Sequence, residues 1–197
     1  MKSVREKRKL EAKTKSKSLT KQKLQPKYEA LSIAKYLFSL DPERKYFNDA
    51  KMAKTESNLT KTLVGNFRIN QILYLLQIFY YVKKHKFLFE GDLYAWDNGF
   101  MVYDVYRHFW TLYNGKWFGE QVENIRDKET KDFLNKYFNY FKQYSVKDLE
   151  EFCHEDPAWI ETWQEEKKEP KVEFSPDTLA FYENFLDNRL QYIEQNQ

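Results

Sequence analysis

Residues 67–84, FRINQILYLLQIFYYVKK, decide the fold of this chain. Their apolar side chains recur every three or four positions, which is the spacing of one face of a helix. Because the apolar positions occupy two faces, the helix must be covered on most of its sides. We therefore expect a helix from about Phe67 to Lys84, capped by Asn66, at the centre of the core. The two faces carry Ile69, Ile72, Leu76 and Phe79, and Leu75, Ile78 and Val82.

Helical spacing also marks the sequence on both sides of this segment. A first helix is expected from Tyr28 to the Asp41-Pro42 pair, because the residue before a proline disfavours helical backbone. The aromatic-rich stretches 101–113 and 126–144 repeat the same spacing. They predict two more helices, the first of which should stop at Asn114-Gly115.

Capping patterns mark the start of two further helices. Ser145 is followed three residues later by Asp148, a pair that resembles a capping box and predicts a short helix to about His154. The triplet Ser175-Pro176-Asp177 combines a cap, a first-turn proline and an acid near the helix start. We expect the last helix to begin there, with its buried stripe formed by Leu179, Tyr182, Leu186, Leu190 and Ile193.

One short region is typical of strands. Residues 87–89 and 93–96 are apolar runs on either side of Glu90-Gly91-Asp92, which predicts a small hairpin with its turn at Gly91, followed by Asn98-Gly99 as a further turn. The chain has 197 residues but only 5 Gly and 5 Pro, too few for a turn-rich β-sandwich. The sequence therefore predicts a mainly α fold, a compact multi-helix single domain over residues 28–197 with one small β-hairpin.

Charge divides the chain into two parts. Residues 1–27 hold 11 Lys and Arg against 2 Glu, whereas residues 28–197 carry a net charge of −6. We interpret residues 1–27 as a flexible basic arm, and the polar residues 41–60 as a mobile connection. The arm is the only part suited to phosphate contacts, since residues 145–197 have a net charge of −9 and would repel a nucleic-acid backbone. A nucleic-acid-associated regulator that uses this arm is the alternative function.

Cysteine usage and hydropathy favour a cytoplasmic protein that does not enter a membrane. Cys153 is the single cysteine, so no disulfide can form within the chain. The most apolar run, Ile72–Val82, is about half of what a bilayer crossing requires. The first residues lack the apolar stretch of a secretory signal.

Candidates for chemistry are few. Cys153 and His154 are neighbours, and adjacent helical side chains point about 100° apart, which disfavours a nucleophile and base pair. Asp104 with His108, four residues apart, and the acidic cluster after His154 could each contribute metal ligands, but an ordinary surface pair and a helix terminus explain them as well. No glycine-rich phosphate loop is present. We expect no catalytic residue, no cofactor and no metal site.

Residues 68–106 resemble the core of the Panacea domain, the SocA-like antitoxin family of phage-associated proteins. That family has a helix reading Lys-Leu-Gln-Lys-Leu-Leu-Tyr, then Gly-Lys-Pro-Leu-Phe, Glu-Ala-Trp and Tyr-Gly-Pro-Val-Val-Pro. The resemblance extends to a first helix at 31–40 and to a C-terminal His and Pro-Trp stretch, and His85 and Ile78 stand where the family usually has glycine. The matching residues are Arg68, Ile69, Leu73, Tyr74, Lys86, Leu88, Phe89, Ala95, Trp96, Gly99, Val105, Tyr106, His154, Pro157 and Trp159.

The resemblance implies a protein that binds another protein. Its partner would be a toxin encoded nearby, which it neutralises by direct binding, or a protease to which it delivers a partner. No catalytic residue is implied, and the oligomeric state is left open. We expect the recognition surface to include residues 93–103, with Trp96, Phe100 and Tyr103 as partner-binding residues, because aromatic side chains are common interface anchors. For Trp96, closing the core over the hairpin is an equally good explanation.

Overall fold

The computed structural model describes residues 28–43, 45–47, 50–52, 61–109, 125–163 and 170–195. These residues form seven helices and six short strands, so the fold is mainly α, as predicted. The helices are α2 (Ala30–Ser39), α3 (Val64–Lys84), α4 (Tyr103–His108), α5 (Lys128–Phe141), α6 (Val146–His154), α7 (Pro157–Thr162) and α8 (Pro176–Gln195). The strands are β1 (Tyr28–Glu29), β2 (Ala50–Met52), β3 (Lys61–Leu63), β4 (Phe89–Glu90), β5 (Leu93–Trp96) and β6 (Gly99–Val102).

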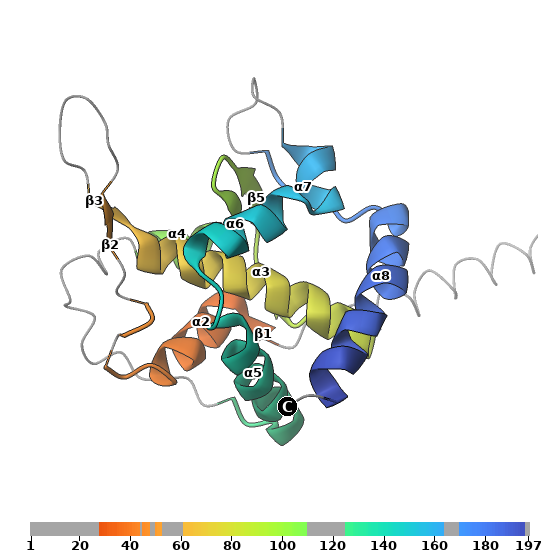
Figure 1. The fold of residues 1–197 in the computed structure, drawn as a ribbon, viewed down its shortest axis with the longest axis horizontal. Helices are drawn as coiled ribbons and strands as arrows, with labels where there is room; N and C mark the ends of the chain where they lie inside the picture. Colours follow the sequence, from red (N-terminus) through yellow and green to blue (C-terminus); the bar gives the residue numbers. More distant parts are fainter. Residues whose placement is uncertain are drawn as a thin grey trace, which may run out of the picture.

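Helix α3 lies at the centre of the molecule, as its sequence predicts. Figure 1 shows α3 crossing the middle of the fold, with α2 and α5 below it, α6 above it and α8 at one side. It contacts all four of these helices and strand β6. Residues 68–82 are all buried, so both apolar faces of the segment 67–84 are covered by the rest of the fold.

Local capping chemistry positions the helices around α3. The predicted capping box is present: Ser145 Oγ accepts from the backbone N–H of Asp148, whose carboxylate accepts from the backbone N–H of Ser145. Ser175 Oγ accepts from the backbone N–H of Thr178 at 3.0 Å, which confirms the predicted start of α8. Asp156 caps α7, a helix that the sequence pattern did not predict. These caps fix where each helix begins without tertiary help.

The hairpin lies one step later in the chain than predicted. Strand β5 pairs antiparallel with β6, with Asp97 and Asn98 at the turn, whereas β4 pairs in parallel with β1. Residues 99–102 are therefore a strand, and the predicted helix from residue 101 begins only at Tyr103 and ends at His108. All four residues of β6 are buried. A strand buried on both faces lacks alternation, and its apolar run cannot be distinguished from helix by spacing alone.

Residues 1–27 and 41–60 are the two segments that the sequence predicts to be flexible. Residues 1–27 lie outside the described residues. Within 41–60, the Asp41 carboxylate accepts from the backbone N–H groups of Lys45, Tyr46 and Phe47 at 2.8–3.0 Å. Strand β2 pairs antiparallel with β3. Part of this connection is thus built into the fold.

Candidate partner-binding site

The β5–β6 turn is held by side chains from three separate helices. Gln71 Nε2 of α3 donates to the carbonyl of Asn98 at 3.0 Å, and His154 Nε2 of α6 donates to the carbonyl of Asp97 at 2.8 Å. Trp159 Nε1 of α7 donates to the carbonyl of Trp96 at 3.0 Å. Three successive carbonyls, of residues 96, 97 and 98, therefore each accept a side-chain hydrogen bond. We call these three donors the turn clamp.

Gly99 completes the attachment of the turn to α6. A Cβ atom at this position would lie 2.9 Å from Cys153 Cβ, and the backbone φ of +105° is one that side chains rarely adopt. Cys153 itself is buried, and burial raises the pKa of its thiol to about 12. At neutral pH the side chain is a thiol that packs against the turn, while its neighbour His154 is engaged with the turn carbonyl.

Of the predicted partner-binding residues, Tyr103 is the one at the surface. It starts α4 and is 38% exposed. Its ring packs edge-on against Tyr94, with centroids 5.8 Å apart, and the Arg107 guanidinium lies 5.5 Å from the ring centroid. These three side chains bring aromatic and cationic character together on the outer side of the hairpin.

Trp96 lies at the edge of the same surface. It is half-buried, and its ring meets Tyr106 edge-on at 4.8 Å. Its Nε1 is buried and has no hydrogen-bond partner among the described residues. An unpaired buried donor costs about 1–3 kcal/mol. We define Tyr94, Trp96, Tyr103, Tyr106 and Arg107 as the hairpin face.

Phe100 is a core residue, and the expectation that it lies exposed as an anchor is wrong. It is 1% exposed and stacks on Tyr74 of α3, with ring centroids 3.5 Å apart and planes 14° apart. The reason is the strand that the sequence pattern missed, because β6 packs directly against α3. A partner cannot reach Phe100 in this conformation.

Two residues that the sequence did not single out as partner-binding also surround the turn. Trp163 Nε1 donates to the Asp97 carboxylate at 3.2 Å, and its ring stacks on Trp159 with centroids 5.0 Å apart. Trp159 lies in α7 and Trp163, four residues later, is the C-cap of this helix. For Trp159 the Pro-Trp resemblance was a usable pattern, whereas for Trp163 only the spacing could have indicated it.

The comparison with protein families identifies this part of the molecule. The model of the family described as antitoxin SocA-like, Panacea domain, matches residues 69–160. The detected similarity to a SocA-like Panacea domain is thus confined to these residues. The match supports an antitoxin-type role with a protein partner. No curated protein and no solved structure matches the chain.

The Panacea match spans the whole turn clamp. It begins in α3 just before Gln71 and ends just after Trp159, so it contains the hairpin and all three donors. Motif residues that are far apart in the sequence thus meet in space around one turn. His85, at the position where the family usually has glycine, has a φ of +51° directly after α3. The left-handed backbone there explains why glycine suits that position.

Asp156, which belongs to the acidic cluster after His154, has a structural role. Asp156 Oδ1 accepts from Tyr182 Oη at 2.5 Å and from the backbone N–H of Ala158 at 2.8 Å, and burial raises the pKa of this carboxyl. Tyr182 also shares a hydrogen bond with Tyr74 at 2.8 Å. Across the described ranges, no three His, Cys, Asp or Glu side chains are grouped so that they could hold a metal ion. Nor does any described helix combine the length and apolar character needed to cross a bilayer.

Proposed function

We propose that this protein is an antitoxin that neutralises a toxin by binding it directly through the hairpin face. The observation that carries the proposal is the match of the SocA-like antitoxin family to residues 69–160, which include every residue of that face. The partner would be a protein encoded by a neighbouring gene. Catalysis has no part in the proposed mechanism, and the buried thiol of Cys153, with its pKa raised to about 12, supports that view.

The hairpin face has the chemistry of a recognition surface. Tyrosine, tryptophan and arginine are the residues enriched among interface anchors, because they bury large areas and also form directed polar contacts. Tyr103 and Arg107 are exposed, and Tyr94 supports the ring of Tyr103. A partner that covers Tyr103 would remove a large apolar ring from water.

The turn clamp explains why such a surface could bind tightly. A flexible loop loses conformational freedom on binding, and that loss weakens the affinity. Here the carbonyls of residues 96, 97 and 98 are tied to three helices before any partner arrives. The aromatic side chains beside the turn are therefore held in place by the fold.

Co-expression tests this proposal. The product of the neighbouring gene should arrest growth when it is expressed alone, and the full chain should relieve the arrest and co-purify with it. Tyr103→Asp should abolish rescue and weaken binding at least tenfold. Leu40→Asp is the matched control, because Leu40 is 37% exposed, is the C-cap of α2 and is not part of the hairpin face. Equal rescue by both variants would contradict the proposed surface.

Delivery to a protease is the other mode of action that the family suggests. The two modes differ in the fate of the partner. Direct neutralisation predicts an unchanged lifetime of the toxin when this chain is present, whereas delivery predicts rapid loss that depends on an ATP-dependent protease. A pulse-chase measurement of the toxin, with and without this chain, separates them.

A further inference from the structure

A second surface lies on the side of the molecule formed by α8. There, α3, α8, the end of α5 and the junction between α6 and α7 enclose a pocket of about 200 Å³. Its walls are mainly apolar and include Ile78, Phe79, Phe152, Phe181, Phe185 and Leu186. Pockets for drug-sized ligands usually measure about 300–1,000 Å³. This one is smaller, and its size suits one or two apolar side chains inserted from outside.

Two phenylalanines of α8 stand at this pocket without being covered. Phe181 is 42% exposed and Phe185 is 61% exposed, and their rings stack with centroids 5.3 Å apart and planes 15° apart. One helical turn separates them, so they lie on the same side of α8. Large apolar side chains that are clustered at a pocket, and not scattered singly, are typical of an interaction site.

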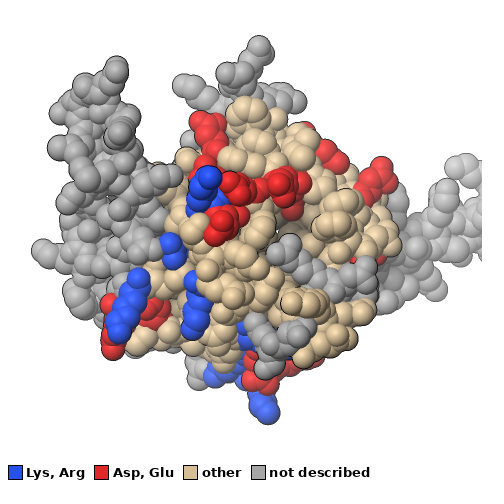
Figure 2. Space-filling model, in the orientation of Figure 1, with Lys and Arg blue, Asp and Glu red and all other residues tan. Residues whose placement is uncertain are grey.

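The surroundings of the pocket are acidic. Residues 146–162 and 176–186, which form α6, α7 and the first half of α8, contain eight carboxylates and a single basic residue, Lys147. Figure 2 shows carboxylates gathered over α6 and α7, whereas most of the visible Lys and Arg lie towards the lower left. Lys147 itself is paired with Glu151 at 3.3 Å. A partner with positive charge would be attracted to this side.

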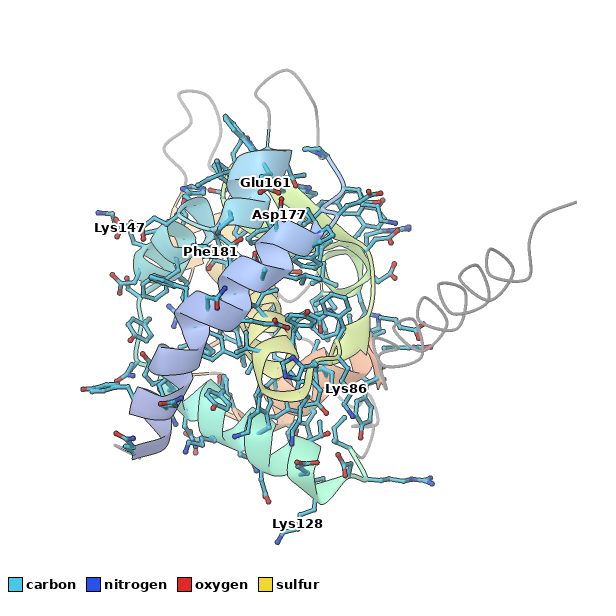
Figure 3. All side chains as sticks on the ribbon, turned by 90° about the vertical axis from the view of Figure 1, so that its right-hand side faces the viewer. Lys86, Lys128, Lys147, Glu161, Asp177 and Phe181 are labelled. Carbon is cyan, nitrogen blue, oxygen red and sulfur yellow. The ribbon has the colours of Figure 1, made fainter. Side chains whose placement is uncertain are left out.

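Glu155, Glu161 and Asp177 are the carboxylates that we call the acidic rim of the pocket. Figure 3 shows α8 crossing the front of the molecule, with Phe181 on the side that faces α6 and with Glu161 and Asp177 near the start of the helix. Glu155 lines the pocket and is exposed. An occupant of the pocket would therefore meet carboxylates as soon as it left the apolar walls.

We propose that this pocket binds an amphipathic helix of a partner protein, with apolar side chains that enter the pocket beside Phe181 and Phe185 and lysine or arginine residues that face the acidic rim. An apolar groove that takes residues spaced at i, i+3 and i+4 is a common way to recognise a helix. The pocket shares no lining residue with the hairpin face. The protein thus has a second docking site that can be occupied while the hairpin face is in use.

A model peptide tests this site without knowledge of the natural partner. The probe is a fluorescent 18-residue helical peptide of leucine and lysine, with leucines at i, i+3, i+4 and i+7. A leucine–glutamate peptide of the same pattern is its control. Fluorescence anisotropy with the full chain should show at least tenfold tighter binding of the lysine peptide, and the affinity should fall as salt is raised.

Two matched variants separate docking from general attraction to an acidic protein. Phe185→Asp should weaken binding of the lysine peptide at least tenfold. Ile160→Asp adds the same charge at a residue of equal exposure, 61%, that does not line the pocket, and should leave binding within twofold. Circular dichroism should show both variants folded. Equal affinities in the two variants, or equal binding of the two peptides, would overturn the proposal.

A second copy of this chain is the competing occupant of the pocket. If the proposal is right, sedimentation should show the same oligomeric state for the wild-type chain and for Phe185→Asp. If the wild type dimerises and Phe185→Asp is monomeric, the pocket is a self-association surface and the proposal is wrong. Growth rescue by Phe185→Asp reports on the hairpin face alone, so failure of one site can be distinguished from failure of the other.

Discussion

The hairpin and the α8 surface differ in how each uses a phenylalanine, Phe100 in the first and Phe185 in the second. Phe100 is 1% exposed and stacked on Tyr74, whereas Phe185 is 61% exposed and, among the described residues, stacks on Phe181 alone. The hairpin is fixed from inside, by an aromatic core and by hydrogen bonds to its turn. The α8 surface instead leaves apolar rings available to a partner. Aromatic content alone therefore does not distinguish a core from a docking surface.

The largest difference is expected from placing the same charge at these two positions. Phe100→Asp would bury an unpaired carboxylate and remove a core ring, at a cost of several kcal/mol, comparable to the whole stability of a domain. Phe185→Asp should change the free energy of unfolding by less than about 0.5 kcal/mol, as is usual for surface substitutions. Urea unfolding followed by circular dichroism measures both. A stable, cooperative Phe100→Asp variant would contradict the burial of this ring.

The close approach of the turn to α6 gives the next largest effect. Gly99→Ala would place a methyl group 2.9 Å from Cys153 Cβ at a φ of +105°. We expect it to destabilise the fold by about 1–3 kcal/mol through backbone strain and overpacking. The measurement is the free energy of unfolding in urea. An unchanged value would mean that the turn does not press against α6.

Removing a single donor of the turn clamp should lower the free energy of unfolding by a smaller amount. Trp159→Phe keeps an aromatic ring but removes the side-chain donor to the carbonyl of Trp96, at a cost of about 1–2 kcal/mol. Trp163→Phe is the matched control: its Nε1 contacts the exposed Asp97 carboxylate, and its loss should cost less than about 0.5 kcal/mol. Comparing the two urea midpoints isolates the contribution of the turn carbonyl. Equal losses of stability in the two variants would mean that the turn-clamp hydrogen bond of Trp159 contributes no more than the surface contact of Trp163.

The smallest effect is expected on the α8 side, at the end of α3. His85 has a φ of +51°, and its Nδ1 lies 3.1 Å from Glu183 Oε1 of α8. His85→Gly should stabilise the protein by about 0.5–1 kcal/mol, because glycine adopts this backbone without strain. His85→Ala loses the ring without relieving the backbone and should destabilise. Thermal unfolding of the two variants should therefore shift in opposite directions, and a loss of stability in both would show that the ring contact outweighs the strain.

The sequence was sufficient to predict the helices that are determined by residues close together in the chain. The apolar faces of residues 67–84, the Ser145 capping box and the Ser175 cap each depend on spacing within one helix, and each is present. The resemblance to the Panacea domain was also visible, because it rests on ordered motifs in one stretch.

Long-range packing explains what the sequence could not predict. The burial of Phe100 depends on contact with α3, which comes much earlier in the chain, and the true partner of β5 could not be chosen between two apolar runs of similar length. The pocket beside Phe185 is formed by residues of five helices, and no pattern within any one of them indicates it. Trp163 acquires its role only when α7 reaches the hairpin turn.

Calorimetric titration of the neighbouring gene's product into this protein tests recognition through the hairpin face. We expect saturable binding by the wild type and at least a tenfold weaker affinity for folded Tyr103→Asp, with Leu40→Asp unchanged. Since tenfold corresponds to about 1.4 kcal/mol, the loss of one exposed aromatic anchor is sufficient to produce it. Absence of binding by the wild type, or equal affinity of Tyr103→Asp and the wild type, would contradict recognition through the hairpin face.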